Sequence, residues 1–169
     1  MTAMNLSEIL VDLTIAEIKS KIPAALQDIR TSRADAFVST EVPQAYFTYP
    51  FAWAYRTPAI FVVVDNIDFR LDRGQNFTAA VVRLNVNVVV EDKDLERLTA
   101  KTYRYQAALC RILQQCRLTA TDGSVVYIVK VIRAEYSQIY TNAQAKDDPQ
   151  GVFRKEVRLE CEVEDYENF

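Results

Sequence analysis

The sequence predicts an α+β fold: a mostly antiparallel sheet of four to five strands, with a long N-terminal helix and a second long helix packed on it. From Val82 to Val90 every even position is aliphatic and three polar residues fall between them, which indicates a strand with one buried face. Directly afterwards, Leu95–Cys116 carries apolar residues at alternating steps of three and four, as in an amphipathic helix. Phe153–Glu164 alternates again and predicts a terminal strand whose inward residues are Val157, Leu159, Cys161 and Val163.

The first helix is expected over Asn5–Arg30, capped by Asn5 or Ser7. Pro23 lacks an amide hydrogen and its ring meets the preceding turn. We therefore expect a kink near Lys21, or a break in which Pro23 opens a second short helix. The apolar stripes of this region would lie over the sheet; the alternative is an N-terminal arm that packs on a neighbouring subunit.

Residues 31–58 form an aromatic-rich connection or arm that three prolines interrupt. In an extended chain the rings at positions 47, 49, 51, 53 and 55 would lie on one side, although Pro50 restricts the segment to an edge strand or a loop. The rings could cover the open side of the core, form a subunit interface, or offer a platform for sugars or bases. The residues concerned are Tyr46, Phe47, Tyr49, Phe51, Trp53 and Tyr55.

The remaining elements follow from local patterns. Ala59–Asp65 is a continuous apolar run that predicts a central strand buried on both faces, and Ile67–Leu71 resumes or continues it. After the second helix, Val125–Tyr136 predicts another strand. Residues 137–151 are long for a hairpin connection and predict a projecting loop. We expect residues 1–169 to form a single domain.

Composition excludes several classes of protein. A net charge of -3 gives no general attraction to nucleic acid, and no sequence-specific nucleic-acid binding is expected. No window is long and apolar enough to span a membrane, and the start has no secretory pattern. The three cysteines show no metal-binding spacing, and we interpret them as reduced core thiols.

The chain has no histidine, which removes Ser-His-Asp and Cys-His nucleophile systems and His-based acid–base chemistry. No phosphate loop or dinucleotide fingerprint is present. Three stretches have residue types that occur in catalytic or metal sites: the Glu-rich face of the terminal strand for a carboxylate pair, Lys130 for a lysine of lowered pKa, and Asp65, Asp68 and Asp72 for a metal. We interpret the Glu-rich face as a charged face that contacts solvent or another subunit, and Lys130 as an edge lysine. The three aspartates lack the spacing of a calcium-binding loop. We therefore expect no catalytic residue, no cofactor and no metal, and we expect that the protein is not an enzyme.

The order of elements resembles that of tail-terminator and related neck proteins of tailed bacteriophages. The resemblance covers most of the chain: a helix at Leu6–Arg30, the strands FVVV and FTAAVVRLNVNVVVED, the helix DLERLTAKTYRYQAALCRILQQ, and the strands VVYIVKVIRAEYS and VFRKEVRLECEVEDYE. Asp92 or Asp94 opens the second helix, and Tyr105 and Leu109 lie on its inner face.

The resemblance implies a structural virion protein of the tail or neck, assembled in the host bacterial cytoplasm. Its subunits would form a hexameric ring that ends tail-tube growth, joins the tail to the head connector, and contacts other neck and tail-tube proteins. DNA would at most pass through the lumen. A ring needs two different complementary patches on each subunit. Our candidates are the six aromatic residues named above and a charged strand face with Arg83, Arg158, Glu160 and Glu162.

Other functions remain open. Within the virion class, a head-completion or connector-adaptor protein is the nearest alternative to a terminator. A cytosolic protein-binding module would be a monomer or dimer without a ring. A histidine-free enzyme would need a concave pocket with convergent Lys or Glu groups.

Overall fold

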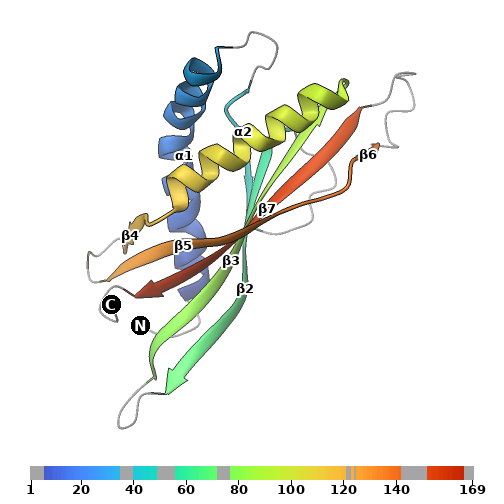
Figure 1. Cartoon of the computed structure of the whole chain (residues 1–169). Coiled ribbons are helices and arrows are strands. Elements are labelled where there is room, and N and C mark those ends of the chain that lie inside the picture. Colours follow the sequence, from blue (N-terminus) through green and yellow to red (C-terminus); the bar gives the residue numbers. More distant parts are fainter. Residues whose placement is uncertain are drawn as a thin grey trace.

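The computed structural model describes residues 6–34, 40–48, 56–71, 77–120, 123, 125–141 and 152–165, the side chains of 70–80 and 165 excepted. Two helices and a set of strands follow one another along the described chain (Figure 1). In order, they are α1 (Leu6–Arg33), β1 (Ala45–Phe47), β2 (Ala59–Leu71), β3 (Phe77–Asp92), α2 (Leu95–Leu113), β4 (Arg117–Thr119), β5 (Val126–Tyr136), β6 (Tyr140–Thr141) and β7 (Phe153–Asp165).

The strands form one seven-stranded sheet in the order β1-β2-β3-β7-β5-β4, with β6 also beside β7. All neighbouring strands are antiparallel except β1 and β2, which are parallel. The α+β class and both long helices are confirmed. The predicted mostly antiparallel sheet of four to five strands is wrong, because the sheet is mixed, with a parallel pair at β1–β2, and also includes β1, β4 and β6. These strands have two or three residues each, too short to show a period of two.

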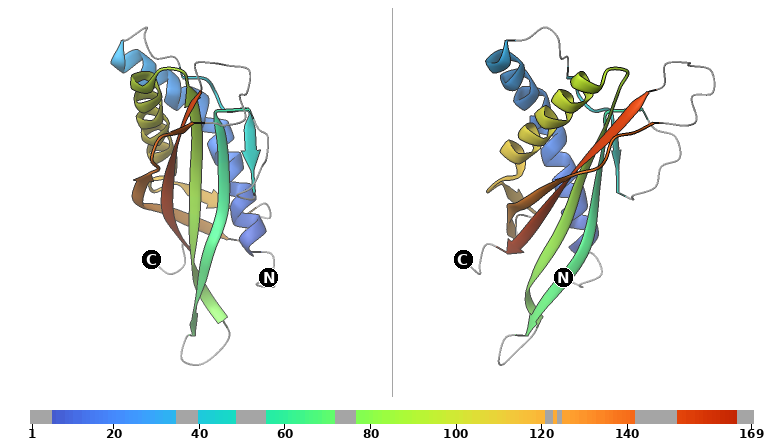
Figure 2. Two further views of the ribbon diagram at one scale, coloured as in Figure 1. Left: turned by 90° about the vertical axis from the view of Figure 1, so that its right-hand side faces the viewer. Right: turned by 45° about the vertical axis from the view of Figure 1, so that its right-hand side comes forward.

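The core lies between one face of the sheet and the two helices. On β3 and β7 the register places aliphatic residues directly opposite each other, at the pairs Leu84–Cys161, Val86–Leu159 and Val88–Val157. All six side chains are fully buried in the main hydrophobic cluster. Helix residues complete this cluster, among them Ile18, Ile22, Leu98, Tyr105 and Leu109. The helices cross each other over the sheet, while β2 and β3 extend past them as a long ribbon (Figures 1 and 2).

Helix α1 continues through Pro23, so the predicted break into two helices is wrong. Pro23 is exposed, whereas its neighbours Ile22 and Leu26 are buried. The proline removes the amide that would bond the carbonyl of Lys19. Because Lys19 is also exposed, water can satisfy that carbonyl, and the buried stripe on the other side keeps the helix intact.

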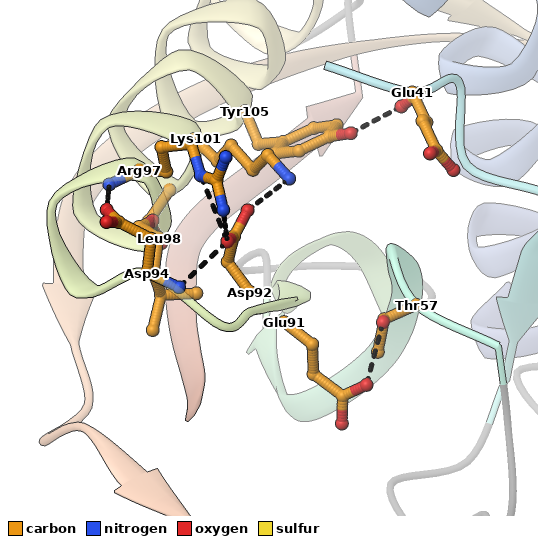
Figure 3. A network of polar contacts seen from close by, with 10 residues as sticks. Glu41, Thr57, Glu91, Asp92, Asp94, Arg97, Leu98, Lys101 and Tyr105 are labelled. Atoms are coloured by element: carbon orange, nitrogen blue, oxygen red, sulfur yellow. Dashed lines mark hydrogen bonds and ion pairs between the residues drawn. The ribbon is translucent and has the colours of Figure 1, made fainter. Parts of the chain in front are cut away.

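Helix α2 begins at two aspartates (Figure 3). Asp94 is the N-cap, and its carboxylate accepts a hydrogen bond of 2.8 Å from the amide of Arg97. Asp92 accepts from the amide of Asp94 at 2.9 Å and from Lys101 Nζ at 2.5 Å, and it lies 3.1 Å from Arg97 Nη2. Although partial burial raises the pKa of Asp92, the hydrogen bonds from Lys101 and Asp94 and the positive charges hold it below the ordinary value.

Two hydrogen bonds tie the connection before β2 to this corner (Figure 3). The hydroxyl of Tyr105 donates to the carbonyl of Glu41, and Thr57 Oγ1 donates to Glu91 Oε2 at 3.0 Å. Burial raises the pKa of Tyr105, so the phenol stays protonated and keeps donating. The described part of the 31–58 connection is therefore fastened to α2 and β3.

We predict that Asp92→Asn destabilises the protein by about 1–2 kcal/mol at pH 7, because the amide loses the charge that Lys101 and Arg97 contact. A carboxylate whose pKa is lowered by folding stabilises the fold above its ordinary pKa, and that stabilisation is lost as the pH falls through the lower, folded pKa. Urea unfolding of wild type between pH 7 and pH 3 should therefore show an acid-dependent loss that the variant lacks.

Glu96→Gln is the matched control, since it removes an exposed carboxylate from the same helical turn. Equal losses in the two variants would contradict the role assigned to Asp92.

Candidate subunit interface

The face of the sheet turned away from the helices carries a ladder of polar residues. The register of β3 against β7 places Arg83 opposite Glu162, Asn85 opposite Glu160, and Asn87 opposite Arg158. The inward residues of the same strands are aliphatic, so the period of two separates the two faces cleanly. All four predicted charged residues, Arg83, Arg158, Glu160 and Glu162, thus lie on one surface.

Side-chain contacts connect this ladder. Arg83 Nη2 lies 3.7 Å from Glu162 Oε1, as expected for a neutralising pair. Arg133 on β5 donates from Nε to Glu160 Oε2 at 2.5 Å, a partner that the sequence reasoning missed because the β5–β7 register was unknown. Asn87 donates from Nδ2 to the carboxylate of Glu156 at 2.8 Å.

Glu156 is the most perturbed carboxylate of this face. Burial raises its pKa, and the hydrogen bond from Asn87 and the charges of Arg158 and Arg154 only partly oppose that rise. Its ionised form is therefore disfavoured in the folded protein relative to the unfolded chain.

Buried polar atoms on this face lack partners among the residues that the structure describes. They are Asn85 Oδ1, Asn87 Oδ1 and Arg83 Nε, and the Asn85 residue is only 8% exposed. Buried polar groups in proteins nearly always have a partner, either water or another chain. The face is thus compatible with a polar contact surface and unlike a finished solvent face.

Of the six predicted aromatic residues, the structure describes Tyr46 and Phe47, which lie on opposite faces of the sheet. Tyr46 packs against the main core, with Lys19 Nζ 4.8 Å from its ring centroid. Phe47 points to the opposite face and stacks on Phe61, with centroids 5.0 Å apart and an interplanar angle of 25°. Phe47 there joins a small second apolar cluster built around Ala59, Phe61 and Val89. Tyr49, Phe51, Trp53 and Tyr55 lie outside the described residues, so their interface role stays a prediction.

A further exposed cluster was not foreseen. Tyr103 on α2 and Tyr136 on β5 meet edge-to-face with centroids 5.5 Å apart, and Lys155 Nζ lies 5.6 Å from each ring centroid. In the sequence, this cluster is indicated only by Tyr103, which lies on the outward side of the apolar pattern of α2. The contact with β5 depends on the tertiary fold.

A hollow of about 540 Å³ lies where the first turns of α1 approach β2. Two of its lining residues, Glu8 and Asp12, are exposed carboxylates on α1. The full lining is Ser7, Glu8, Val11, Asp12, Thr48, Val63 and Val64. The lining thus combines carboxylates and hydroxyls with valine side chains.

The structure also describes the surroundings of two buried cysteines and of Lys130, whereas Asp72 lies outside the described residues. Burial raises the pKa of Cys116 to about 11 and that of Cys161 to about 12, so both buried thiols stay protonated. Lys130 is exposed on β5, as an edge lysine would be. Across the described ranges, no group of three metal-ligating side chains occurs. Neither described helix is long and apolar enough to cross a membrane.

No family model and no curated protein matches the chain. Among solved structures, it is similar to a chain in the virion of a native gene transfer agent (GTA) particle, with 17% sequence identity and a TM-score of 0.43. The similarity covers 87% of this chain and 94% of that chain.

Glu156→Gln is predicted to raise stability slightly at pH 7, because the neutral amide avoids burying a charge and can still accept the hydrogen bond from Asn87. A carboxylate whose pKa is raised by folding makes stability fall as the pH rises through its ordinary and folded pKa values. Urea midpoints from pH 4 to pH 8 should therefore decline less in the variant than in wild type.

Glu164→Gln, on the same strand and the same face, provides the comparison. A lower midpoint for Glu156→Gln at pH 7 would show that the charge is needed for folding, contrary to this account.

Proposed function

We propose that the protein is a ring-forming structural subunit of a tailed-phage virion, and within that class a tail terminator. The observation that carries the proposal is the asymmetry of the sheet. Its apolar face is covered by the chain's own helices, while its other face presents a polar ladder with unpartnered buried atoms. A subunit of this kind folds alone and retains contact surface for neighbours.

Two further features support this role. The order helix, strands, helix, strands agrees with the element order by which the sequence resembles tail-terminator and neck proteins. The described residues also contain no group of three metal-ligating side chains, and burial raises the pKa of the thiols of Cys116 and Cys161. An assembly role needs neither a metal nor a reactive thiol.

In this role six copies would close a ring at the head-proximal end of the tail, halt growth of the tail tube, and present a surface to the head connector. DNA would pass through the lumen, and the protein would reside in the virion after assembly in the bacterial cytoplasm. The acidic excess of the chain, with a net charge of -3, suits a channel that lets DNA slide without holding it.

The direct test is the mass of the purified protein by sedimentation or light scattering. A closed hexamer has six times the subunit mass of 19.3 kDa, and electron microscopy should show rings. A monomer at all concentrations would overturn the proposal. Rings that bind unfinished tail tubes indicate a terminator, whereas rings that bind filled heads indicate a head-completion or connector-adaptor protein.

We further expect the double substitution Phe51→Ala and Trp53→Ala to weaken the ring while leaving the subunit folded, because aromatic side chains contribute much of the buried area at interfaces. Sedimentation should show dissociation at concentrations at which wild type stays assembled. Leu95→Ala, which truncates an exposed apolar side chain on α2, is the control and should keep the ring. An unchanged oligomer in the double variant would exclude the aromatic segment from the interface.

A further inference from the structure

The sheet ends at two outer edges that other described strands cover only in part. On β2, β1 pairs with Ala59–Phe61 and no described strand pairs beyond them. On β5, β4 pairs with Val126–Ile128, the Gln115 amide donates to the carbonyl of Val129, and the amide of Val131 donates to Gln114 Oε1. Beyond that point no described strand lies along the outer side of β5.

The open part of β5 presents backbone groups outward. The amide of Ser137 donates to the carbonyl of Glu156, so Ser137 points toward β7. Because adjacent residues of a strand point in opposite directions, Glu135 also faces β7, whereas Ala134 and Tyr136 direct their amides and carbonyls away from the sheet. Every residue of Ile132–Tyr136 is exposed. An exposed edge of this kind is a template for a further strand.

The two edges carry opposite charge. The exposed charged residues of β4 and β5 are three basic residues and one acidic residue, namely Arg117, Lys130, Arg133 and Glu135. Those of the described β2 side chains are both acidic, Asp65 and Asp68. The hollow beside β2 adds two more carboxylates, Glu8 and Asp12. Arg133 already contacts Glu160 and Glu135 within the subunit, so Lys130 is the basic residue of β5 that can attract the acidic residues beside β2.

Direction and facing also agree. Strands β2, β3, β7 and β5 alternate in direction, so β5 of one copy placed beside β2 of the next would continue the antiparallel pattern. Tyr136 pairs with Val157, a core residue, so its ring lies on the helix side of the sheet. Ile67 pairs with the core residue Val82, and Phe69, two residues further along β2, lies on that same side. Asp68 and Glu135 lie on the polar side. Exposed aromatic residues would thus meet on one face and polar residues on the other.

We propose that the open edge of β5 adds to the open edge of β2 of the next copy, so that the sheet continues from subunit to subunit. This inference rests on the proposed ring function and names the contact that builds the ring. The two edges are different surfaces, so the contact is head-to-tail, and repetition by rotation closes a ring. The fold itself is unaffected, because the contact uses backbone groups that point outward, while Val62, Val64 and Ile67 keep their side chains in the core.

The first test replaces an outward amide. Ala134→Pro removes a hydrogen-bond donor from the outer edge and leaves the bonds to β7 in place, as proline is tolerated where its nitrogen faces away from the sheet. Ring association should weaken about tenfold or more, since each lost interfacial hydrogen bond costs roughly one factor of ten. Ala134→Val keeps the amide and should assemble as wild type does. A stable Ala134→Pro ring overturns the inference and leaves the proposed function standing.

The second test does not depend on how well the edge tolerates proline. Glu135→Cys is mixed before assembly with Asn66→Cys or with Asp68→Cys, and the rings are oxidised. Neighbouring antiparallel residues on one face lie about 4.5–5.5 Å apart between Cα atoms, within reach of a disulfide. A cross-linked dimer should form in at least one mixture, and in none of the single variants or in wild type, whose cysteines are buried or half-buried.

The outcomes separate the two proposals. Rings without any cross-link in either mixture, or a cross-link of Glu135→Cys with itself, overturn the β5–β2 contact only. A wild-type protein that never assembles overturns the ring function itself, and the edge contact with it.

Discussion

The pairing of β3 with β7 is the constraint on which the rest of the structure depends. From Val82 opposite Val163 to Asp92 opposite Phe153 the register is unbroken, and it aligns two aliphatic rows on one face. A slip of β7 by one residue against β3 would move the aliphatic row of β7 to the polar face and bring Glu162 into the core. The cost of burying that charge, on the order of several kcal/mol, therefore helps the aliphatic contacts to specify the register.

The arrangement of everything else follows from this double-faced pair. The helices cover the aliphatic rows, and the opposite face of the sheet is polar. That polar face and the sheet edges are therefore the surfaces that the helices leave uncovered. In the polar ladder, Arg83, Arg133 and Asn87 contact carboxylates of β7. Other buried polar atoms of the ladder, such as Asn85 Oδ1, have no hydrogen-bond partner among the described residues. In the proposed role, stability and assembly would depend on different parts of the fold: the core on the helices, and contacts between copies on the polar face and the sheet edges.

Sequence reasoning predicted the elements that carry their own pattern. β3, α2 and β7 have long, regular spacing, and Asp94 caps α2 as expected from its position before an apolar stripe. It failed at β1, β4 and β6, which exist only because a longer strand offers them hydrogen bonds. It also failed at Pro23, where burial of Ile22 and Leu26 outweighs the local penalty. The charged half of the candidate interface was placed correctly on one face, but the partner Arg133 and the rings Tyr103 and Tyr136 depend on registers and crossings that no single stretch encodes.

The central claim is that copies join at the edges of this sheet while its core stays as it is in the single subunit. Hydrogen–deuterium exchange on the dissociated and the assembled protein tests it most directly, since it reports the protection of each backbone amide. The account predicts that assembly slows exchange at Ala134, at Tyr136 and along the second half of β2, and leaves the amides of β3 and β7 unchanged. Assembly that protects other surfaces and leaves both edges exchanging as before would contradict it.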